Sequence, residues 1–323
     1  MSKAILSKIV NFSLILTLCL LMLGSFTRLM NAGLGCPDWP GCYGQLVAPS
    51  ATDETISQAF PNKPVETQKA WIEMIHRYVA GVLGLLILVI VIVAVKIHAN
   101  KQIIKLSIIL LFTVIFQALL GMWTVTMLVY PAIVTAHLLG GMLTISLLWL
   151  VHLNLKIPTP KTKAPLFLSL GVIVIFIQIS LGGWVSTNYA ALACPAFPQC
   201  YFEKLLPSMD LIVAFDVRMV EGLNYEGGIL SADARATIQM IHRLGALLVG
   251  IYLLIVALVF IQKPNPAIKT AAWVLLLVLI GQVSLGIANV YFLLPLPLAV
   301  LHNGGAALLL LSMLSLRHLA KTY

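Results

Sequence analysis

Long apolar runs dominate the chain, and short polar segments separate them. About 20 apolar residues in a helix cross the hydrocarbon core of a bilayer, and a helix satisfies its own backbone hydrogen bonds there. The apolar runs predict eight transmembrane helices, near residues 9–28, 71–95, 103–127, 132–153, 166–187, 236–261, 270–291 and 296–316. The expected fold class is therefore an all-α integral membrane protein.

A seven-residue motif occurs twice, each time at the start of an apolar run. Residues 71–77 read Trp-Ile-Glu-Met-Ile-His-Arg, and residues 237–243 read Thr-Ile-Gln-Met-Ile-His-Arg. A second histidine follows each copy, since His137 lies 61 residues after His76 and His302 lies 60 residues after His242. This spacing predicts one four-helix unit written twice.

The two units are expected to form two parallel-repeat four-helix bundles, an N-terminal half at residues 1–155 and a C-terminal half at residues 166–323. Four helices return the chain to the side on which it began, so both halves have the same orientation. An axis along the membrane normal is expected to relate them. A connection at residues 154–165, with Pro158, Pro160 and three lysines, separates the halves.

Composition and charge placement predict the orientation. The chain has 60% hydrophobic and 10% charged residues and a net charge of +9, which excludes an ordinary soluble domain with about 25% charged residues. Lysines gather in the loops on one side, and all 11 acidic residues lie in the other loops or at the helix ends beside them. The positive-inside rule therefore predicts cytoplasmic N- and C-termini. Topology explains the positive charge, and no nucleic-acid partner is expected.

Two of the expected external loops carry cysteine pairs with the same spacing, Cys36 with Cys42 and Cys194 with Cys200. In an outward-facing, oxidising compartment this pattern predicts the disulfides Cys36–Cys42 and Cys194–Cys200. A zinc site is the alternative, but each loop supplies only two cysteines and no histidine.

Histidines inside apolar helices are costly and usually functional. His76, His137, His242 and His302 are expected about 9 Å below the outer membrane surface, at 1.5 Å per residue. Two imidazoles from facing helices suit haem better than zinc, because a porphyrin supplies four nitrogens and needs only axial ligands, whereas zinc takes three or four protein ligands. Each half is therefore expected to hold one haem. The other histidines, expected to be solvated or at headgroup level at cytoplasmic helix ends, are His98, His152 and His318.

The two copies differ where chemistry would be expected. Glu73 lies one helical turn before His76 on the same helix face, and its counterpart is the uncharged Gln239. Arg28 also has no basic counterpart, because the matching position is Ser186. A carboxylate beside only one haem could shuttle protons or stabilise a developing cation. This asymmetry assigns substrate chemistry to the first half and a bis-histidine electron relay to the second.

Two further features leave alternatives open. Arg77 and Arg243 directly follow the motif histidines, and either could pair with an outward-facing haem propionate or snorkel to lipid phosphates. Glycines end the recurring segments 117–121, 178–182 and 282–286. Such glycines let a neighbouring helix or a flat ligand approach closely, and helix packing is the simpler explanation.

Together, the eight expected helices in two halves, the motif at 73–77, His137, His242-Arg243, His302 and the two cysteine pairs resemble the haem A synthases. These membrane enzymes convert haem O to haem A, and the resemblance covers nearly the whole chain. It implies that His242 and His302 bind haem b in the second half. It also implies that His76 and His137 flank the substrate haem, with Glu73 needed for turnover.

The resemblance further implies that the C8 methyl of haem O is oxidised to a formyl group, through two hydroxylations and loss of water from a gem-diol. The paired cysteines resemble the bacterial branch of the family, which implies the bacterial cytoplasmic (inner) membrane and delivery of haem O by a haem O synthase. The second loop has Ala196 and Gln199 where the first has Asp38 and Gly41, so equal roles for the two disulfides do not follow. The electron donor, the oxygen source and the oligomeric state stay open, with a homo-oligomer as one alternative.

Two other functions fit part of this pattern. A non-catalytic dihaem b-type cytochrome for quinol electron transfer would use the same four histidines, but it would not need a carboxylate beside only one site. A transporter built on a parallel repeat would use the histidines as proton relays and would hold no haem. The difference between Glu73 and Gln239 favours the enzyme.

Overall fold

The computed structural model describes residues 2–157, 165–203 and 205–321. Within these residues eight helices are long and apolar enough to cross a membrane: α1 (Lys3–Leu29), α3 (Thr67–Lys96), α4 (Lys101–Thr126), α5 (Pro131–Lys156), α6 (Leu166–Thr187), α8 (Ala232–Ile261), α9 (Pro266–Tyr291) and α10 (Leu296–Leu319). Two short helices, α2 (Glu54–Ala59) and α7 (Leu211–Ala214), lie in the long loops. The predicted all-α fold class with eight membrane helices is confirmed.

Four helices, α1, α4, α8 and α9, begin a few residues before the predicted apolar runs, and a capping side chain holds the first turn of each. The Ser2 side chain accepts a hydrogen bond from the amide of Ile5, so α1 begins at Lys3. The Ser231 side chain does the same for Ala234, and Asp233 lies in the first turn of α8, where a negative charge is favourable. Apolarity alone does not reveal these polar turns.

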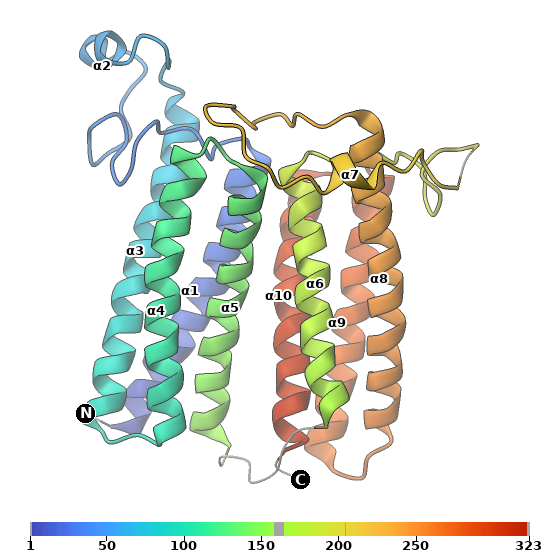
Figure 1. Ribbon diagram of the computed structural model, residues 1–323. Coiled ribbons are helices and arrows are strands. Elements are labelled where there is room, and N and C mark those ends of the chain that lie inside the picture. Colours follow the sequence, from blue (N-terminus) through green and yellow to red (C-terminus); the bar gives the residue numbers. More distant parts are fainter. Residues whose placement is uncertain (1, 158–164, 204, 322–323) are drawn as a thin grey trace.

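The long helices form two groups that meet along one boundary (Figure 1). In the first group, α1 contacts α3 and α5, and α4 contacts the same two helices; in the second, α6, α8, α9 and α10 contact one another in a similar ring. Contacts between α1 and α10, α5 and α6, and α5 and α10 join the groups. Their symmetry and the limits 1–155 and 166–323 stay predictions, and residues 158–164 of the expected connection lie outside the described residues.

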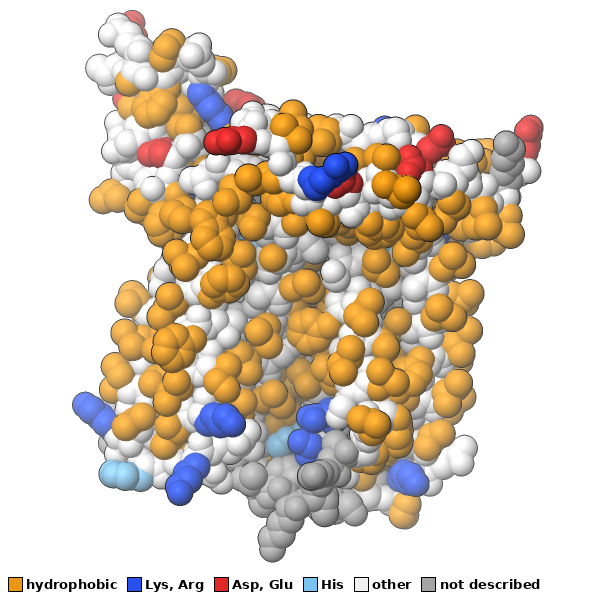
Figure 2. Space-filling model, in the orientation of Figure 1, with side chains coloured by type: hydrophobic (Ala, Val, Ile, Leu, Met, Phe, Trp, Pro, Cys, Tyr) orange, Lys and Arg blue, Asp and Glu red, His pale blue; other side chains and the backbone are white. Residues whose placement is uncertain are grey.

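Each group has its own apolar core. In the first, Leu6, Ile87, Leu110 and Leu148 are fully buried together, whereas large apolar side chains such as Leu85 are exposed on the outside. Figure 2 shows hydrophobic side chains covering the middle of the molecule, with basic side chains at the lower end and the visible acidic side chains, together with a few basic ones, at the upper end. This surface suits a bilayer, and the sidedness expected from the lysines stays a prediction.

The loop between α6 and α8 reaches across to the first helix group. The amide of Tyr225 donates to the Leu128 carbonyl at 3.1 Å, and the Tyr130 hydroxyl donates to the Val217 carbonyl. Leu128 and Val129 have φ of 49° and 53°, which turns the chain sharply between α4 and α5. The loop therefore covers this turn and links the two groups at their outer ends.

Arg28 makes a second link between the groups. Its Nη2 donates to the carbonyls of Ser186 and Thr187 at 2.7 and 3.4 Å, at the end of α6, and its guanidinium lies 4.2 Å from the ring centre of Tyr189. The last carbonyls of a helix have no partner within it, and a cation is favourable there. Arg28 of α1 thus caps α6, which explains one difference between the two copies.

Replacing Arg28 with Met should lower the stability of the protein in detergent. Hydrogen bonds from a charged donor contribute about 1.5–3 kcal/mol, and this variant loses those to both carbonyls of α6. Thermal unfolding of the purified protein measures the effect. The control is Arg218→Met, which removes only an exposed ion pair with Asp216 and should change little. Equal unfolding midpoints for the two variants would contradict a linking role for Arg28.

Candidate haem-binding site

Each intramembrane histidine points one edge of its imidazole at a glycine on a neighbouring helix. A Cβ added at any of these glycines would lie 3.0–3.4 Å from the Cε1 atom of the facing ring. The pairs are His76 (α3) with Gly24 (α1), His137 (α5) with Gly121 (α4), His242 (α8) with Gly182 (α6), and His302 (α10) with Gly286 (α9). An added Cβ would press on the ring by a few tenths of an ångström at Gly24, Gly182 and Gly286 and would just touch it at Gly121, so these glycines allow a close approach to the imidazole.

The four histidines are divided between the two helix groups, with His76 on α3 and His137 on α5, and His242 on α8 and His302 on α10. In each group the two histidine helices lie on opposite sides of the ring of four helices. That each couple shares one metal stays a prediction. Within the described part of the chain, the buried Nδ1 atoms of His76, His137 and His302 have no hydrogen-bond partner. Buried polar atoms are normally satisfied, so these ring nitrogens are open to a further ligand.

The residues present fit a haem. A porphyrin needs one or two axial imidazoles and an apolar enclosure, and each half offers two buried imidazoles on facing helices. The described residues contain no group of three or more His, Cys, Asp or Glu side chains that could hold a metal ion. His242 and His302 would hold haem b, and His76 and His137 would flank the substrate haem.

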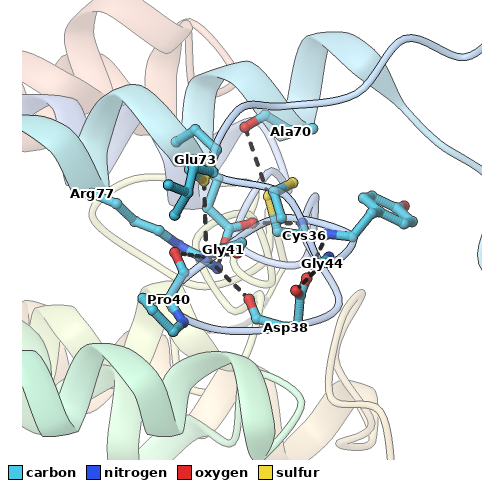
Figure 3. Close-up of a disulfide and its surroundings, with 12 residues drawn as sticks. Cys36, Asp38, Pro40, Gly41, Gly44, Ala70, Glu73 and Arg77 are labelled. Atoms are coloured by element: carbon cyan, nitrogen blue, oxygen red, sulfur yellow. Dashed lines mark hydrogen bonds and ion pairs between the residues drawn. A yellow bond between two sulfur atoms is a disulfide. The ribbon is translucent and has the colours of Figure 1, made fainter. Parts of the chain in front are cut away.

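Glu73 is buried at the outer end of α3, with 4% of its surface exposed. Its Oε1 pairs with Nη2 of Arg77 at 2.5 Å, and its Oε2 accepts a hydrogen bond from the amide of Cys36 at 2.9 Å. Figure 3 shows this carboxylate between the helix and the disulfide loop. Both contacts stabilise the anion, and together they tie the first disulfide to the residue three positions before His76.

The two predicted disulfides, Cys36–Cys42 and Cys194–Cys200, are both formed, with Cα atoms 4.8 and 4.3 Å apart. Asp38 holds the first loop, because its carboxylate accepts from the amides of Tyr43 and Gly44 at 2.6 and 2.8 Å. The second loop has Ala196 at this position and lacks the interaction. This gives a physical reason for the sequence difference between the loops.

The arginines after the motif histidines make contacts that the sequence did not predict. Arg77 donates to the carbonyls of Asp38 and Pro40 at 3.0 and 3.1 Å, and also to that of Gly41. In the second half, Arg243 donates to the carbonyls of Cys194, Ala196 and Gln199 at 2.7–2.9 Å. Both guanidinium groups therefore hold a disulfide loop onto its helix. Contact with haem propionates stays a prediction.

Gln239 marks the main difference between the halves. It is as buried as Glu73, with 5% exposed, but among the described residues its Oε1 has no hydrogen-bond partner. The second half thus keeps the arginine and the loop without the carboxylate. Of the two copies of the motif, the first carries a buried carboxylate three residues before its histidine, and the second carries an uncharged glutamine there.

The prediction for the histidines outside the site was partly wrong. His318 is buried, with 4% exposed, and His152 is half-buried with its Nδ1 atom 2.7 Å from Oδ1 of Asn11 on α1. His98 lies in the short turn between α3 and α4. The helices pack closely at this end, so a position near a helix end did not ensure solvent contact.

The sequence analysis also missed three glutamines beside the histidines. Each glutamine contacts one histidine through its amide nitrogen: Gln117 contacts His137, Gln178 contacts His242, and Gln282 contacts His302. Each lies four residues before one of the glycines that face an imidazole. A position-by-position comparison of the four helices that carry these glycines, α1, α4, α6 and α9, could have found them.

The fold and the site together define a multi-pass membrane protein with two pairs of buried histidines suited to haem. Residues 7–314 match the family model described as cytochrome oxidase assembly protein, and the chain belongs to this family. It is 43% identical to the haem A synthase of Shewanella oneidensis over 97% of this chain and 96% of that protein. It is also 25% identical to the haem A synthases of Shouchella clausii, over 84% of this chain and 82% of that one, and of Bacillus cereus, over 88% and 84%.

Arg77→Gln should destabilise the protein more than Arg243→Gln. Both variants lose bonds to loop carbonyls, but only the first leaves a buried carboxylate without its partner, which costs about 3–5 kcal/mol. Thermal unfolding of the purified variants measures the difference. Adding Glu73→Gln to Arg77→Gln should restore much of the loss. Equal unfolding midpoints for the two single variants would show that the Glu73 charge does not depend on Arg77.

Proposed function

We propose that this protein is a haem A synthase, which oxidises the C8 methyl group of haem O to a formyl group. One observation carries the proposal: of two similar pairs of buried imidazoles, only the first has a buried carboxylate beside it. An electron carrier with two equivalent haems has no use for this difference, whereas an enzyme needs one reactive site. The similarity to the Shewanella oneidensis haem A synthase over nearly the whole chain supports the same conclusion.

In the proposed reaction, His76 and His137 orient the substrate haem, and Glu73 acts on its methyl group. Two successive hydroxylations, each a two-electron oxidation that replaces a C–H bond of the methyl group with a C–O bond, give a gem-diol, and loss of water leaves the formyl group. Positive charge can develop on the carbon as each C–H bond breaks, and a proton must be taken up. Glu73 can accept a proton at a carboxylate oxygen or stabilise that charge. Arg77 and the Cys36 amide fix the carboxylate, which is 4% exposed.

In the second half, His242 and His302 would hold haem b in an apolar enclosure. When bound there, haem b would supply one-electron chemistry, so this half can relay electrons for the substrate site. Gln239, where the first half has Glu73, leaves this site without an acidic group. Arg243 holds the second disulfide loop over the site and remains a candidate partner for a propionate.

The remaining parts of the proposal concern the surroundings. The N- and C-termini face the cytoplasm, because the lysine-rich end of the molecule is the cytoplasmic end by the positive-inside rule. The membrane is then the bacterial cytoplasmic membrane, with the disulfide loops on its oxidising side. Haem O is hydrophobic and arrives through the lipid phase, from the haem O synthase that makes it.

The experiment that tests the proposal is haem extraction from the purified protein, followed by chromatography. Haem B together with haem O or haem A is expected. Haem B alone, with no haem A formed in cells that supply haem O, would favour the dihaem cytochrome. A protein without haem absorbance would favour the transporter.

Glu73→Gln should abolish haem A formation while haem b stays bound. Loss of a general acid or base costs about 10²–10⁴-fold in rate, and the substitution keeps the size of the side chain. Haem A is measured by chromatography and haem b by its optical spectrum. Glu66→Gln is the control, because it removes only an exposed carboxylate paired with Lys69 and should leave haem A formation unchanged. Normal haem A formation in Glu73→Gln would rule out its catalytic role.

His242→Ala and His302→Ala should lose the resident haem b, because each removes an axial ligand. His76→Ala should keep haem b and lose activity, since its ligand site belongs to the substrate. Pyridine haemochrome assays on the purified variants give the amount of haem b per protein. Loss of haem b in the His76→Ala variant would contradict the division of roles between the halves.

A further inference from the structure

Three of the four histidines contact a glutamine from the neighbouring helix. Nε2 of Gln178 lies 2.9 Å from both the carbonyl oxygen and Nδ1 of His242. Nε2 of Gln117 donates to the carbonyl oxygen of His137 at 3.0 Å, and Nε2 of Gln282 lies 3.4 Å from Nε2 of His302. Each glutamine therefore holds the helix backbone at a histidine, the imidazole ring, or both.

A glycine makes room for each of these carboxamides. The glycine lies three residues after the histidine, and a Cβ added there would collide with the glutamine Oε1 atom. The pairs are Gln117 with Gly140, Gln178 with Gly245, and Gln282 with Gly305. The arrangement thus needs two residues at once, a glutamine on one helix and a glycine on the next.

The fourth histidine lacks both of these residues. Leu20 lies four residues before Gly24, where the other helices have glutamine, and Val79 lies three residues after His76, where the others have glycine. Replacing only the glycine would cause a collision with the glutamine, and replacing only the glutamine would leave an empty space. Because both residues are replaced together, this site is built differently from the other three. His76 therefore has no carboxamide beside it.

The free hydrogen-bonding groups point to a role in holding the ring. Within the described residues, the buried Oε1 atoms of Gln117 and Gln282 have no hydrogen-bond partner, and neither have the Nδ1 atoms of His137 and His302. At both sites the glutamine with the unpaired acceptor contacts the same histidine, through the backbone carbonyl of His137 and through ring Nε2 of His302. A histidine that binds a metal usually donates its other ring N–H to such an acceptor, which fixes the orientation of the ring.

We propose that Gln117, Gln178 and Gln282 are positioning residues for the axial histidines, and that Leu20 and Val79 leave His76 free to release its haem. The inference rests on the proposed function, in which haem binds at these histidines. Both ligands of the haem b site are then held by a carboxamide, but only one ligand of the substrate site is. A cofactor must stay bound, whereas a substrate must enter and leave, and the number of held ligands follows this requirement.

The test exchanges the two arrangements in the full-length, haem-loaded protein. Gln178→Leu with Gly245→Val copies into the second half the pair Leu20 and Val79, which the chain already accommodates in the first. Haem b should then transfer to apomyoglobin about tenfold faster or more, since partners of metal-bound histidines affect affinity by about 10–100-fold. The reduction potential of haem b should also shift. The reciprocal variant, Leu20→Gln with Val79→Gly, should slow release of haem O or haem A by a similar factor.

Controls separate positioning from packing and from the proposed function. Wild-type transfer rate and potential in the Gln178→Leu, Gly245→Val variant would overturn the inference. If haem b transfers faster from this variant while its potential is unchanged and the unfolding midpoint of the protein falls to a similar degree, the two residues have only a packing role. That result would also overturn the inference. If the wild-type protein binds no haem at His242 and His302, the proposed function fails. If the wild-type protein binds haem b and makes haem A, but the substitutions leave the haem transfer rates unchanged, only this inference is wrong.

Discussion

The burial of four imidazoles among apolar helices is the constraint on which the rest of the structure depends. Lipid offers no hydrogen bond to a ring nitrogen, so each buried ring needs a partner within the protein or a ligand. The glycines at positions 24, 121, 182 and 286 bring a helix against each ring, and glutamines satisfy part of the polar surface at three of them. The ring nitrogens that remain unpaired cost about 1–3 kcal/mol each, which coordination would offset. The fold is therefore built to be completed by a ligand at these positions.

The outer loops add a second constraint, because each is attached to the helix that carries a histidine. Arg77 and Arg243 bind the carbonyls of the two disulfide loops in nearly the same way. Only the first arginine also pairs with a carboxylate, Glu73, which in turn accepts from the loop at Cys36. The first loop, the arginine and the carboxylate thus form one connected network above the first histidine pair. One change, from glutamine to glutamate, gives the same scaffold a charged group beside one site.

Much of the fold could be predicted from the sequence, because apolar runs of bilayer length leave few alternatives. The helix starts at Lys3 and Ala232 could not be predicted, because they depend on capping side chains and not on apolarity. The histidine pairs and the disulfides followed from a repeated motif. The motif did not predict the contacts of Arg77 and Arg243, because these contacts depend on the path of an irregular loop. The link from Arg28 to the end of α6 likewise needed the arrangement of the two helix groups, which no local pattern contains.

The positions at which the two halves differ share one location. Leu20, Arg28, Glu73 and Val79 lie on α1 and α3, and their counterparts Gln178, Ser186, Gln239 and Gly245 lie on α6 and α8. The other helix pair of each half keeps the same four residues: Gln117, Gly121, His137 and Gly140 correspond to Gln282, Gly286, His302 and Gly305. One imidazole of each site is thus surrounded by the same residue types, and the imidazole beneath the disulfide loop is surrounded by different ones. On the proposed function, the shared pair gives each haem a fixed ligand, and the variable pair decides whether the haem stays as a cofactor or reacts and leaves.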